Sequence, residues 1–462
     1  MELAQERGEA HPALLVMVVV VLVVGLSLLV NTGGDDREPT GFGASSLAGA
    51  ETGCAEDPQL VASRVEQVRG LSFERVPTIE CLPPEELRKR VRELIEEAGE
   101  DDELSPSERR RERAEGEASL VTLKLAGLLP PDFDESANAV ASVGLETAGV
   151  YVPESGTVLI SPGPESERYL AHELVHALDD QNFGVDREAS RSSEADAGYQ
   201  ALVEGSATFH EVLYAQRFLD SGIDPRDAIR ARSLLEAPSG SPPLLQYLLF
   251  SYLAGGQFVA TLVEEGGSAT VNEAYKDPPT STGEILHPEE WFEREDFEPI
   301  AASEAGRVLG ARWERIGAGE AGEVDAILTL EQGGSSELAR VAAKGIEGGR
   351  YEAWKLPGDC KQPCRDRRVA IISYRFEGER DAVQFKVAAE EYIREGLGAD
   401  RAVVASDART GLGSVSTEGF PLADGAVAVG RGTRSGSIAF APGARLANGL
   451  ATRAAIAADA RD

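Results

Sequence analysis

The chain has 462 residues, of which 42% are hydrophobic and 27% are charged. This length is enough for two or three domains. The composition is typical of folded proteins and excludes wholesale disorder. The 79 acidic residues outnumber the 45 basic residues, so the formal net charge is −34. Nucleic acids and anionic lipid headgroups require a basic surface, so the charge argues against such partners and we expect no nucleic-acid binding.

The N-terminal part contains an uncharged apolar run at residues 13–30, ALLVMVVVVLVVGLSLLV. Because a bilayer is spanned by about 20 apolar residues, the run predicts a single transmembrane anchor after a short cytoplasmic leader at residues 1–12. A cleaved signal peptide is the alternative, although its apolar region is usually about 7–15 residues long and ends at a small-residue cleavage site. Residues 31–56 are rich in small and polar residues, which predicts a flexible linker.

The four cysteines fall into two local pairs, Cys54 with Cys81 and Cys360 with Cys364. Two pairs with no leftover thiol predict two disulfide bonds, which form in an oxidising compartment. We therefore expect a single-pass protein of the cell membrane whose main body lies outside the cytoplasm. A zinc knuckle built on Cys360 and Cys364 is the alternative for the second pair.

The first elements of the body are predicted from residue 57 onwards. Helical spacing of apolar residues begins there, and Pro83-Pro84 opens a second helix. The highly charged stretch at residues 97–117 is typical of a solvated loop or helix face. Two β-rich runs, residues 149–152 and residues 157–160, are separated by Pro-Glu-Ser-Gly and predict a β-hairpin.

Residues 172–176 read His-Glu-Leu-Val-His. A preceding Pro164 and a leucine at every fourth position predict that this motif lies within a helix. Side chains four residues apart share one helix face, so His172 and His176 can bind one metal ion. A zinc ion lowers the pKa of bound water to about 7, and Glu173 is placed to accept the proton. Two unrelated surface histidines are the alternative interpretation.

A catalytic zinc site needs a third protein ligand and an open position. We expect this ligand to be Glu204, in a second predicted helix that folds back antiparallel to the first. Gly205 has no side chain and would let these two helices approach closely. His210 and Glu211 are the rival ligands, and a solvated helix acid is the alternative interpretation of Glu204.

Four further side chains are candidates for supporting roles. Asp180 is one turn after the second motif histidine, and Asp196 is two turns before Glu204. Either carboxylate can accept a hydrogen bond from the outer nitrogen of a ligand histidine. Attack of a metal-activated water on a carbonyl group creates an oxyanion that needs a hydrogen-bond donor, for which His287 and Tyr252 are candidates, with a structural role as the alternative for each.

The rest of the chain is predicted to be helical to about residue 345, followed by an α+β region at residues 346–462. Residues 244–263 form a second uncharged run, but its polar residues and Gly-Gly pair favour a buried core helix over a second membrane span. A Gly-Arg-Gly segment at residues 430–432 lies between two predicted strands, which argues against a dinucleotide site. The expected fold class is α+β, predominantly helical.

The sequences HELVHALDDQ and ALVEGSAT resemble the gluzincins, zinc metallopeptidases whose third metal ligand is a glutamate. The chain is most similar to a group of largely uncharacterised, membrane-anchored bacterial proteins assigned as metallopeptidases. The similarity extends over roughly residues 57–395 and includes the segments VEQVRGL, AGVYVPESGTVLIS, YLAGGQFV and PPTSTGEILHPEEW.

This resemblance implies that His172, His176 and Glu204 bind one zinc ion and that Glu173 is the general base. It also implies that the hairpin before the motif helix supplies an edge strand for pairing with the substrate backbone. One departure is Thr208, since some gluzincins have an aspartate four residues after the third ligand.

The expected domain organisation places a metallopeptidase-like domain at residues 57–345, between the linker and the C-terminal region. The expected activity is zinc-dependent hydrolysis of a peptide or protein substrate. One alternative is a non-catalytic binding or scaffold ectodomain stabilised by zinc, in which His210 or Glu211 would fill the open position. Another is a hydrolase of non-peptide amide bonds, such as those of cell-wall crosslinks.

Overall fold

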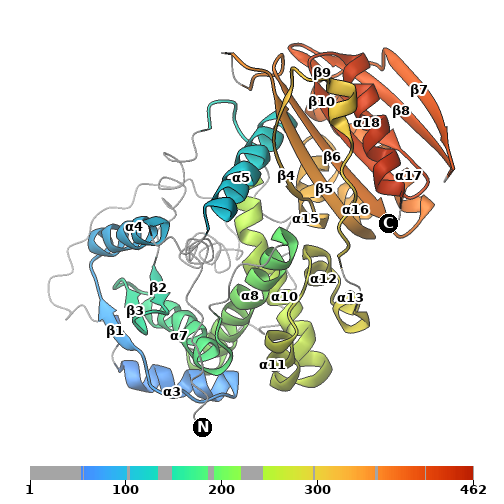
Figure 1. The fold of residues 1–462 in the computed structure, drawn as a ribbon. Helices are drawn as coiled ribbons and strands as arrows, with labels where there is room; N and C mark the ends of the chain where they lie inside the picture. Colours follow the sequence, from blue (N-terminus) through green and yellow to red (C-terminus); the bar gives the residue numbers. More distant parts are fainter. Residues whose placement is uncertain are drawn as a thin grey trace, which may run out of the picture.

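The computed structural model describes residues 54–55, 57–100, 105–133, 148–185, 192–219, 243–294, 297–358, 360, 363–411 and 413–460. The leader, the anchor at residues 13–30 and nearly all of the linker expected from the sequence lie outside these residues. Within the described part, no helix is long and apolar enough to span a membrane. The fold combines helices with two β-sheets, in agreement with the α+β class expected from the sequence (Figure 1).

The N-terminal part is built around a three-stranded sheet with the strand order β1-β3-β2. Strands β2 (Gly149–Val152) and β3 (Thr157–Ile160) form the expected antiparallel hairpin, and β1 (Thr78–Cys81) pairs with β3 in parallel. Alternate side chains face opposite sides, so that Val150 packs with helix α4 (Pro84–Glu100), whereas Tyr151 packs with helices α3 (Pro58–Arg69) and α7 (Ser166–Phe183).

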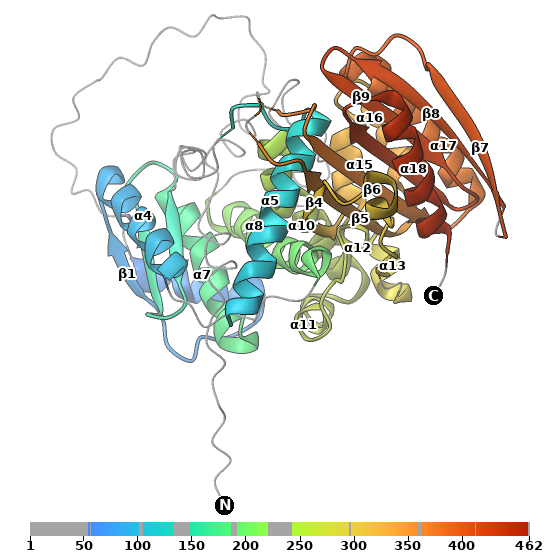
Figure 2. The same ribbon diagram turned by 45° about the horizontal axis from the view of Figure 1, so that its top comes forward.

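Two long helices, α8 (Ser193–Phe218) and α10 (Pro243–Gly266), lie between this N-terminal part and the C-terminal sheet (Figures 1 and 2). Helix α10 contains the apolar run at residues 244–263, and its buried side chains Phe250, Phe258 and Leu262 belong to the main core. Three shorter helices follow: α11 (Ser268–Lys276), α12 (Thr282–Leu286) and α13 (Pro288–Glu293).

Helices α8 and α10 cross in direct backbone contact at Gly205 and Gly255. A Cβ atom added to Gly205 would lie 2.2 Å from the carbonyl carbon of Gly255. Gly205 therefore allows a close helix approach, as the sequence suggested, but the partner is α10 and not the motif helix α7. A glycine in the sequence indicates that another helix can approach closely there, but it does not indicate which helix does so.

The C-terminal part is a seven-stranded antiparallel sheet with the order β4-β5-β6-β10-β9-β8-β7. Its strands are β4 (Glu314–Glu320), β5 (Ile346–Lys355), β6 (Arg368–Phe376), β7 (Val404–Thr410), β8 (Gly413–Leu422), β9 (Gly425–Arg431) and β10 (Ser435–Ala441). Its helices are α5 (Pro106–Ala126), α14 (Ala305–Leu309), α15 (Glu323–Leu330), α16 (Ser336–Ala343), α17 (Glu379–Glu391) and α18 (Ala444–Asp459), with a π-helical turn at Tyr392–Gly396.

The two faces of this sheet pack against different helices. In β9, Ala426 and Ala428 pack against α18, whereas Val427 and Val429 face the main core, which includes residues of α17, α15, α8 and α10. Because β4 precedes residue 346, the sheet takes its first strand from a stretch that we expected to be helical. The segment at residues 430–432 ends β9 and leads to β10, as expected from the sequence.

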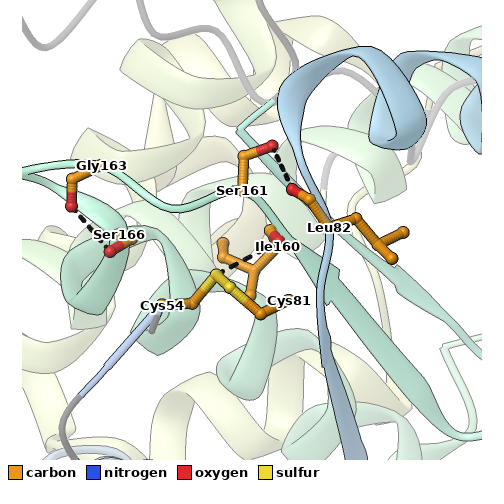
Figure 3. The surroundings of a disulfide bond; sticks show 7 residues. All are labelled: Cys54, Cys81, Leu82, Ile160, Ser161, Gly163 and Ser166. Carbon is orange, nitrogen blue, oxygen red and sulfur yellow. Dashed lines mark hydrogen bonds between the residues drawn. A yellow bond between two sulfur atoms is a disulfide. The ribbon is translucent and has the colours of Figure 1, made fainter. Parts of the chain in front are cut away.

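Both expected disulfide bonds are present, Cys54–Cys81 and Cys360–Cys364, so the second pair does not form a zinc knuckle. Figure 3 shows the first disulfide, which joins the segment before α3 to β1 and lies beside Ile160 of β3. Cys54 is buried there, although it falls within the stretch that we expected to be a flexible linker.

Candidate metal centre

Helix α7 places the three polar residues of the His-Glu-Leu-Val-His motif inside the protein. Its leucines at positions 170, 174 and 178 are fully buried and fix the orientation of the helix, which ends at Gly184 in the left-handed conformation (φ 67°). His172, Glu173 and His176 are at most 2% exposed. Buried polar side chains of this kind need a bonding partner, which directs attention to the helix that faces them.

Helix α8 runs antiparallel to α7, because Arg168 contacts Glu211 while His176 faces Glu204. The Nε2 atoms of His172 and His176 lie 3.1 Å apart, and Glu204 Oε2 lies 3.5 Å from each of them. These three residues form the only such cluster of His, Cys, Asp and Glu ligand atoms among the described residues.

The spacing of these atoms fits a tetrahedral zinc site. Ligands held about 2.0–2.2 Å from zinc at tetrahedral angles lie about 3.3–3.6 Å from one another. The three observed separations, 3.1, 3.5 and 3.5 Å, are close to this range. Glu204 Oε2 is also buried without a hydrogen-bond partner, so the donor set and the orphaned oxygen both fit a metal ion.

The electrostatics of the cluster favour a positive charge at its centre. Burial lowers the pKa of His172, but the carboxylates of Glu204 and Glu211 beside it raise it to about 10. Burial raises the pKa of Glu204, but the two imidazoles beside it lower it to about 2. Without a metal, a proton therefore supplies the charge that these carboxylates require.

Glu173 lies beside the cluster and faces strand β2. Both of its carboxylate oxygens are buried without a hydrogen-bond partner, and burial raises its pKa. A Cβ atom added to Gly149 of β2 would lie 3.0 Å from Glu173 Cγ and 2.7 Å from Ile160 Cδ1. The glycine therefore lets the edge strand of the small sheet pass close to this carboxylate.

Tyr252 of α10 reaches the same cluster. Its ring stacks on that of His172, with the ring centroids 6.2 Å apart, and its hydroxyl interacts with the Glu204 carboxylate. Burial, followed by the charges of Glu204 and Glu173, raises the pKa of Tyr252 well above its usual value, so its hydroxyl keeps its proton. The crossing of α8 and α10 at Gly255, three residues further along α10, brings it to this position.

Two other candidates from the sequence, Asp180 and His287, have partners outside the cluster. Asp180 accepts hydrogen bonds from the Tyr151 hydroxyl (2.8 Å) and from the backbone N–H of Val185 (3.1 Å), so it steadies β2 and not a ligand histidine. His287 pairs with Glu323 of α15, with 2.9 Å between Nε2 and Oε1. Asp196 is in the first turn of α8, where an acidic side chain complements the helix dipole.

The two rival ligands do not enter the cluster. Glu211 Oε2 lies 3.0 Å from Nδ1 of His172, the nitrogen that points away from the cluster. The Nδ1–H of His210 donates to the Ser206 carbonyl oxygen (2.8 Å), and burial lowers the pKa of His210 to about 4. Among the described residues the cluster therefore has three protein ligands and no fourth.

A buried ion pair between α3 and α7 lies next to the motif histidines. Arg69 of α3 donates to Asp179 of α7 (2.7 Å), and both side chains are at most 1% exposed. Asp179 also accepts hydrogen bonds from Ser206 of α8 (2.7 Å) and Tyr275 of α11 (2.8 Å). One carboxylate thus connects α7 with three other helices next to the motif histidines.

Two residues that hold the cluster, Gln200 and Arg168, were not predicted from the sequence. The Gln200 side chain donates to Glu204 Oε1 (3.2 Å), which leaves Oε2 for the histidines. Gln200 lies one turn before Glu204, and this spacing alone indicated that the two side chains could meet. Glu211 was considered only as a metal ligand, although it binds the outer nitrogen of His172, and Arg168, its partner, was not considered.

Comparisons with protein-family models, with curated proteins and with solved structures found no match to this chain.

Proposed function

We propose that this chain is a zinc-dependent peptidase, anchored in the cell membrane through residues 13–30, with its body outside the cytoplasm. The observation that carries the proposal is the buried group His172, His176 and Glu204, which can hold a metal ion and has Glu173 beside it. The resemblance of the motif helices to the gluzincins supports the same activity. The two disulfide bonds support the location, since such bonds persist in oxidising compartments.

The number of protein ligands favours a catalytic site over a structural one. A structural zinc site is closed by four protein ligands, whereas a catalytic site has three and keeps one position open. Glu211 and His210, the nearest candidates for a fourth ligand, are engaged with other partners. This argues against the scaffold alternative in the described part of the chain.

In the proposed reaction each residue has a defined task. A bound zinc ion would supply Lewis-acid activation of the water and of the scissile carbonyl group. Glu173 takes the proton that the attacking water loses and delivers it to the leaving nitrogen, a task for which its buried carboxylate lies beside the cluster. The protonated Tyr252 hydroxyl is a donor for the developing oxyanion.

The substrate is proposed to bind as an extended chain along β2. In the described residues β2 pairs with β3 on one side only and so forms the edge of the small sheet. An edge strand offers free backbone groups to a peptide, and Gly149 keeps this edge close to Glu173. This arrangement favours a peptide or protein substrate over a small amide.

The test compares wild type with Glu173→Gln, using zinc-loaded full-length protein, a random peptide library and a cell-wall crosslink substrate. We expect wild type to bind one zinc ion and to cleave peptides, and Glu173→Gln to keep the zinc but lose at least about 100-fold in rate. Glu167→Gln, on the same helix but paired with Arg64, is the matched control and should keep both properties.

Three outcomes would contradict the proposal. Wild-type rates in Glu173→Gln would remove the general base from the mechanism. Zinc-loaded wild type that cleaves neither substrate would favour the scaffold alternative, and cleavage of the cell-wall crosslink alone would favour the amide hydrolase.

A further inference from the structure

A line of alternating basic and acidic side chains connects α7 and α8 on the side of the cluster nearest the start of α7. Arg168, His172 and His176 follow one another at four-residue spacing on α7 and therefore share a face. Glu204 and Glu211 are seven residues apart on α8, a spacing that also places them on one face. Arg168 meets Glu211, His172 lies between Glu211 and Glu204, and His176 meets Glu204.

Glu211 is the fixed point of this arrangement, because each of its oxygens has its own partner. Oε1 accepts a hydrogen bond from Arg168 Nε at 2.6 Å, and Oε2 lies 3.0 Å from His172 Nδ1. The Glu211 side chain is only 4% exposed. A buried carboxylate is costly unless it is paired, and the guanidinium of Arg168 supplies the opposite charge.

Arg168 is itself held in place at two points. In addition to Glu211, its guanidinium contacts Glu165 at the start of α7, with 3.4 Å between Nη1 and Oε2. Its side chain is 12% exposed. A planar guanidinium that bridges two carboxylates has little rotational freedom, so it fixes the position of the Glu211 carboxylate.

The consequence for His172 concerns which ring nitrogen carries the proton. A carboxylate at Nδ1 requires that nitrogen to donate, which leaves the lone pair of Nε2 directed at the cluster. Thr208, one turn after Glu204, does not make this contact, since its buried hydroxyl has no hydrogen-bond partner. The carboxylate that orients His172 is therefore that of Glu211, about one turn after Thr208 on α8.

We propose that Arg168 and Glu211 form a relay that orients His172 as a metal ligand, with Arg168 acting as a positioning residue through Glu211. The inference rests on the metal-binding part of the proposed function and adds to it a determinant of zinc affinity that lies outside the ligand set. Changes to groups that orient zinc-bound histidines commonly weaken metal binding about 10–100-fold.

The experiment measures zinc affinity of the full-length protein by competition with a chelator, and the visible absorption spectrum of the cobalt(II)-substituted protein. We expect Arg168→Met and Glu211→Gln to weaken zinc binding at least about tenfold and to alter the cobalt spectrum. The matched control is Arg64→Met, which removes the partner of Glu167, one residue away from Arg168 on the same helix. It should bind zinc within twofold of wild type.

Other results would contradict either the relay or the proposed function. A folded Arg168→Met variant that binds zinc like wild type would overturn the relay. An equal loss in Arg64→Met would also overturn it, because it would reduce Arg168 to a structural role. If Arg168→Met does not fold, Arg168→Lys is measured in its place. We expect Arg168→Lys to weaken zinc binding at least about threefold, and an unchanged zinc affinity would overturn the proposal. Wild type that binds no zinc would instead contradict the proposed function.

Discussion

Gly205 is the point at which α8 touches α10, and we predict that Gly205→Ala destabilises the protein. The added Cβ would lie 2.2, 2.3 and 2.7 Å from the carbonyl carbon, the oxygen and the Cα of Gly255. All three atoms belong to the backbone, so no side-chain rotation can relieve the overlap. To reach ordinary contact, about 3.4 Å or more, the two helices must move apart by about 1.2 Å.

The expected magnitude follows from what these helices carry. Separating α8 from α10 loosens the core around Leu202, Phe250 and Phe258. We therefore expect a loss near the upper end of the range for overpacked cores, about 3 kcal/mol. Gly116→Ala in α5 is the matched control, because a Cβ there meets no atom within 4 Å and alanine favours a helix by about 0.5–1 kcal/mol.

The assay is urea unfolding of the full-length chain, followed by far-ultraviolet circular dichroism. The unfolding midpoint should fall for Gly205→Ala and stay equal or rise for Gly116→Ala, although the two substitutions are chemically identical. Zinc affinity should also fall for Gly205→Ala, since the shift displaces Glu204 and Tyr252. A wild-type midpoint for Gly205→Ala would refute the close crossing of α8 and α10.

Three further predictions concern stability, each measured from urea midpoints. Arg69→Met leaves the buried carboxylate of Asp179 without its ion-pair partner and should cost about 3–5 kcal/mol. Burial and the charge of Asp325 raise the pKa of Glu194 to about 8, so the folded protein keeps a proton that the unfolded chain releases above its ordinary pKa of 4.5. Stability should therefore fall as the pH rises from about 4.5 to about 8, and Glu194→Gln should remove that part of the decrease. Cys54→Ser opens a disulfide that spans 27 residues and should cost about 3.5 kcal/mol.

The same chain offers controls for the ion-pair and disulfide predictions. Arg307→Met, in an exposed ion pair with Glu304, should change stability by less than about 1 kcal/mol. Opening the disulfide at Cys360, which spans only four residues, should cost about 2 kcal/mol. Equal losses for Arg69→Met and Arg307→Met, an unchanged pH dependence in Glu194→Gln, or equal costs for the two disulfides would each contradict the corresponding reasoning.

The local features of the site were predictable from the sequence because they depend on periodicity. The four-residue spacing of His172 and His176 placed both on one helix face, and the β-rich runs on either side of a turn gave the hairpin beside Glu173. Glu204 followed from the need for a third ligand on a helix returning past the first. Two local cysteine pairs gave the two disulfide bonds.

The remaining features depend on how helices cross, which periodicity does not reveal. Glu211 shares a helix face with Glu204, but only the antiparallel packing of α7 and α8 determines that it meets Nδ1 of His172. Asp180 was expected at a ligand histidine and instead binds the Tyr151 hydroxyl, because Tyr151 of β2 packs against α7. Strand β4 was missed because its Gly-rich sequence, ERIGAGE, has little β propensity, and pairing with β5 stabilises it.

A crystal structure of the zinc-loaded full-length protein, with anomalous data at the zinc edge, would show whether the metal site has three protein ligands and an open position. We expect one anomalous peak about 2.0–2.2 Å from His172 Nε2, His176 Nε2 and a Glu204 carboxylate oxygen, with no other protein ligand. A peak elsewhere in the molecule, or Glu211 as a fourth ligand to the same ion, would contradict it.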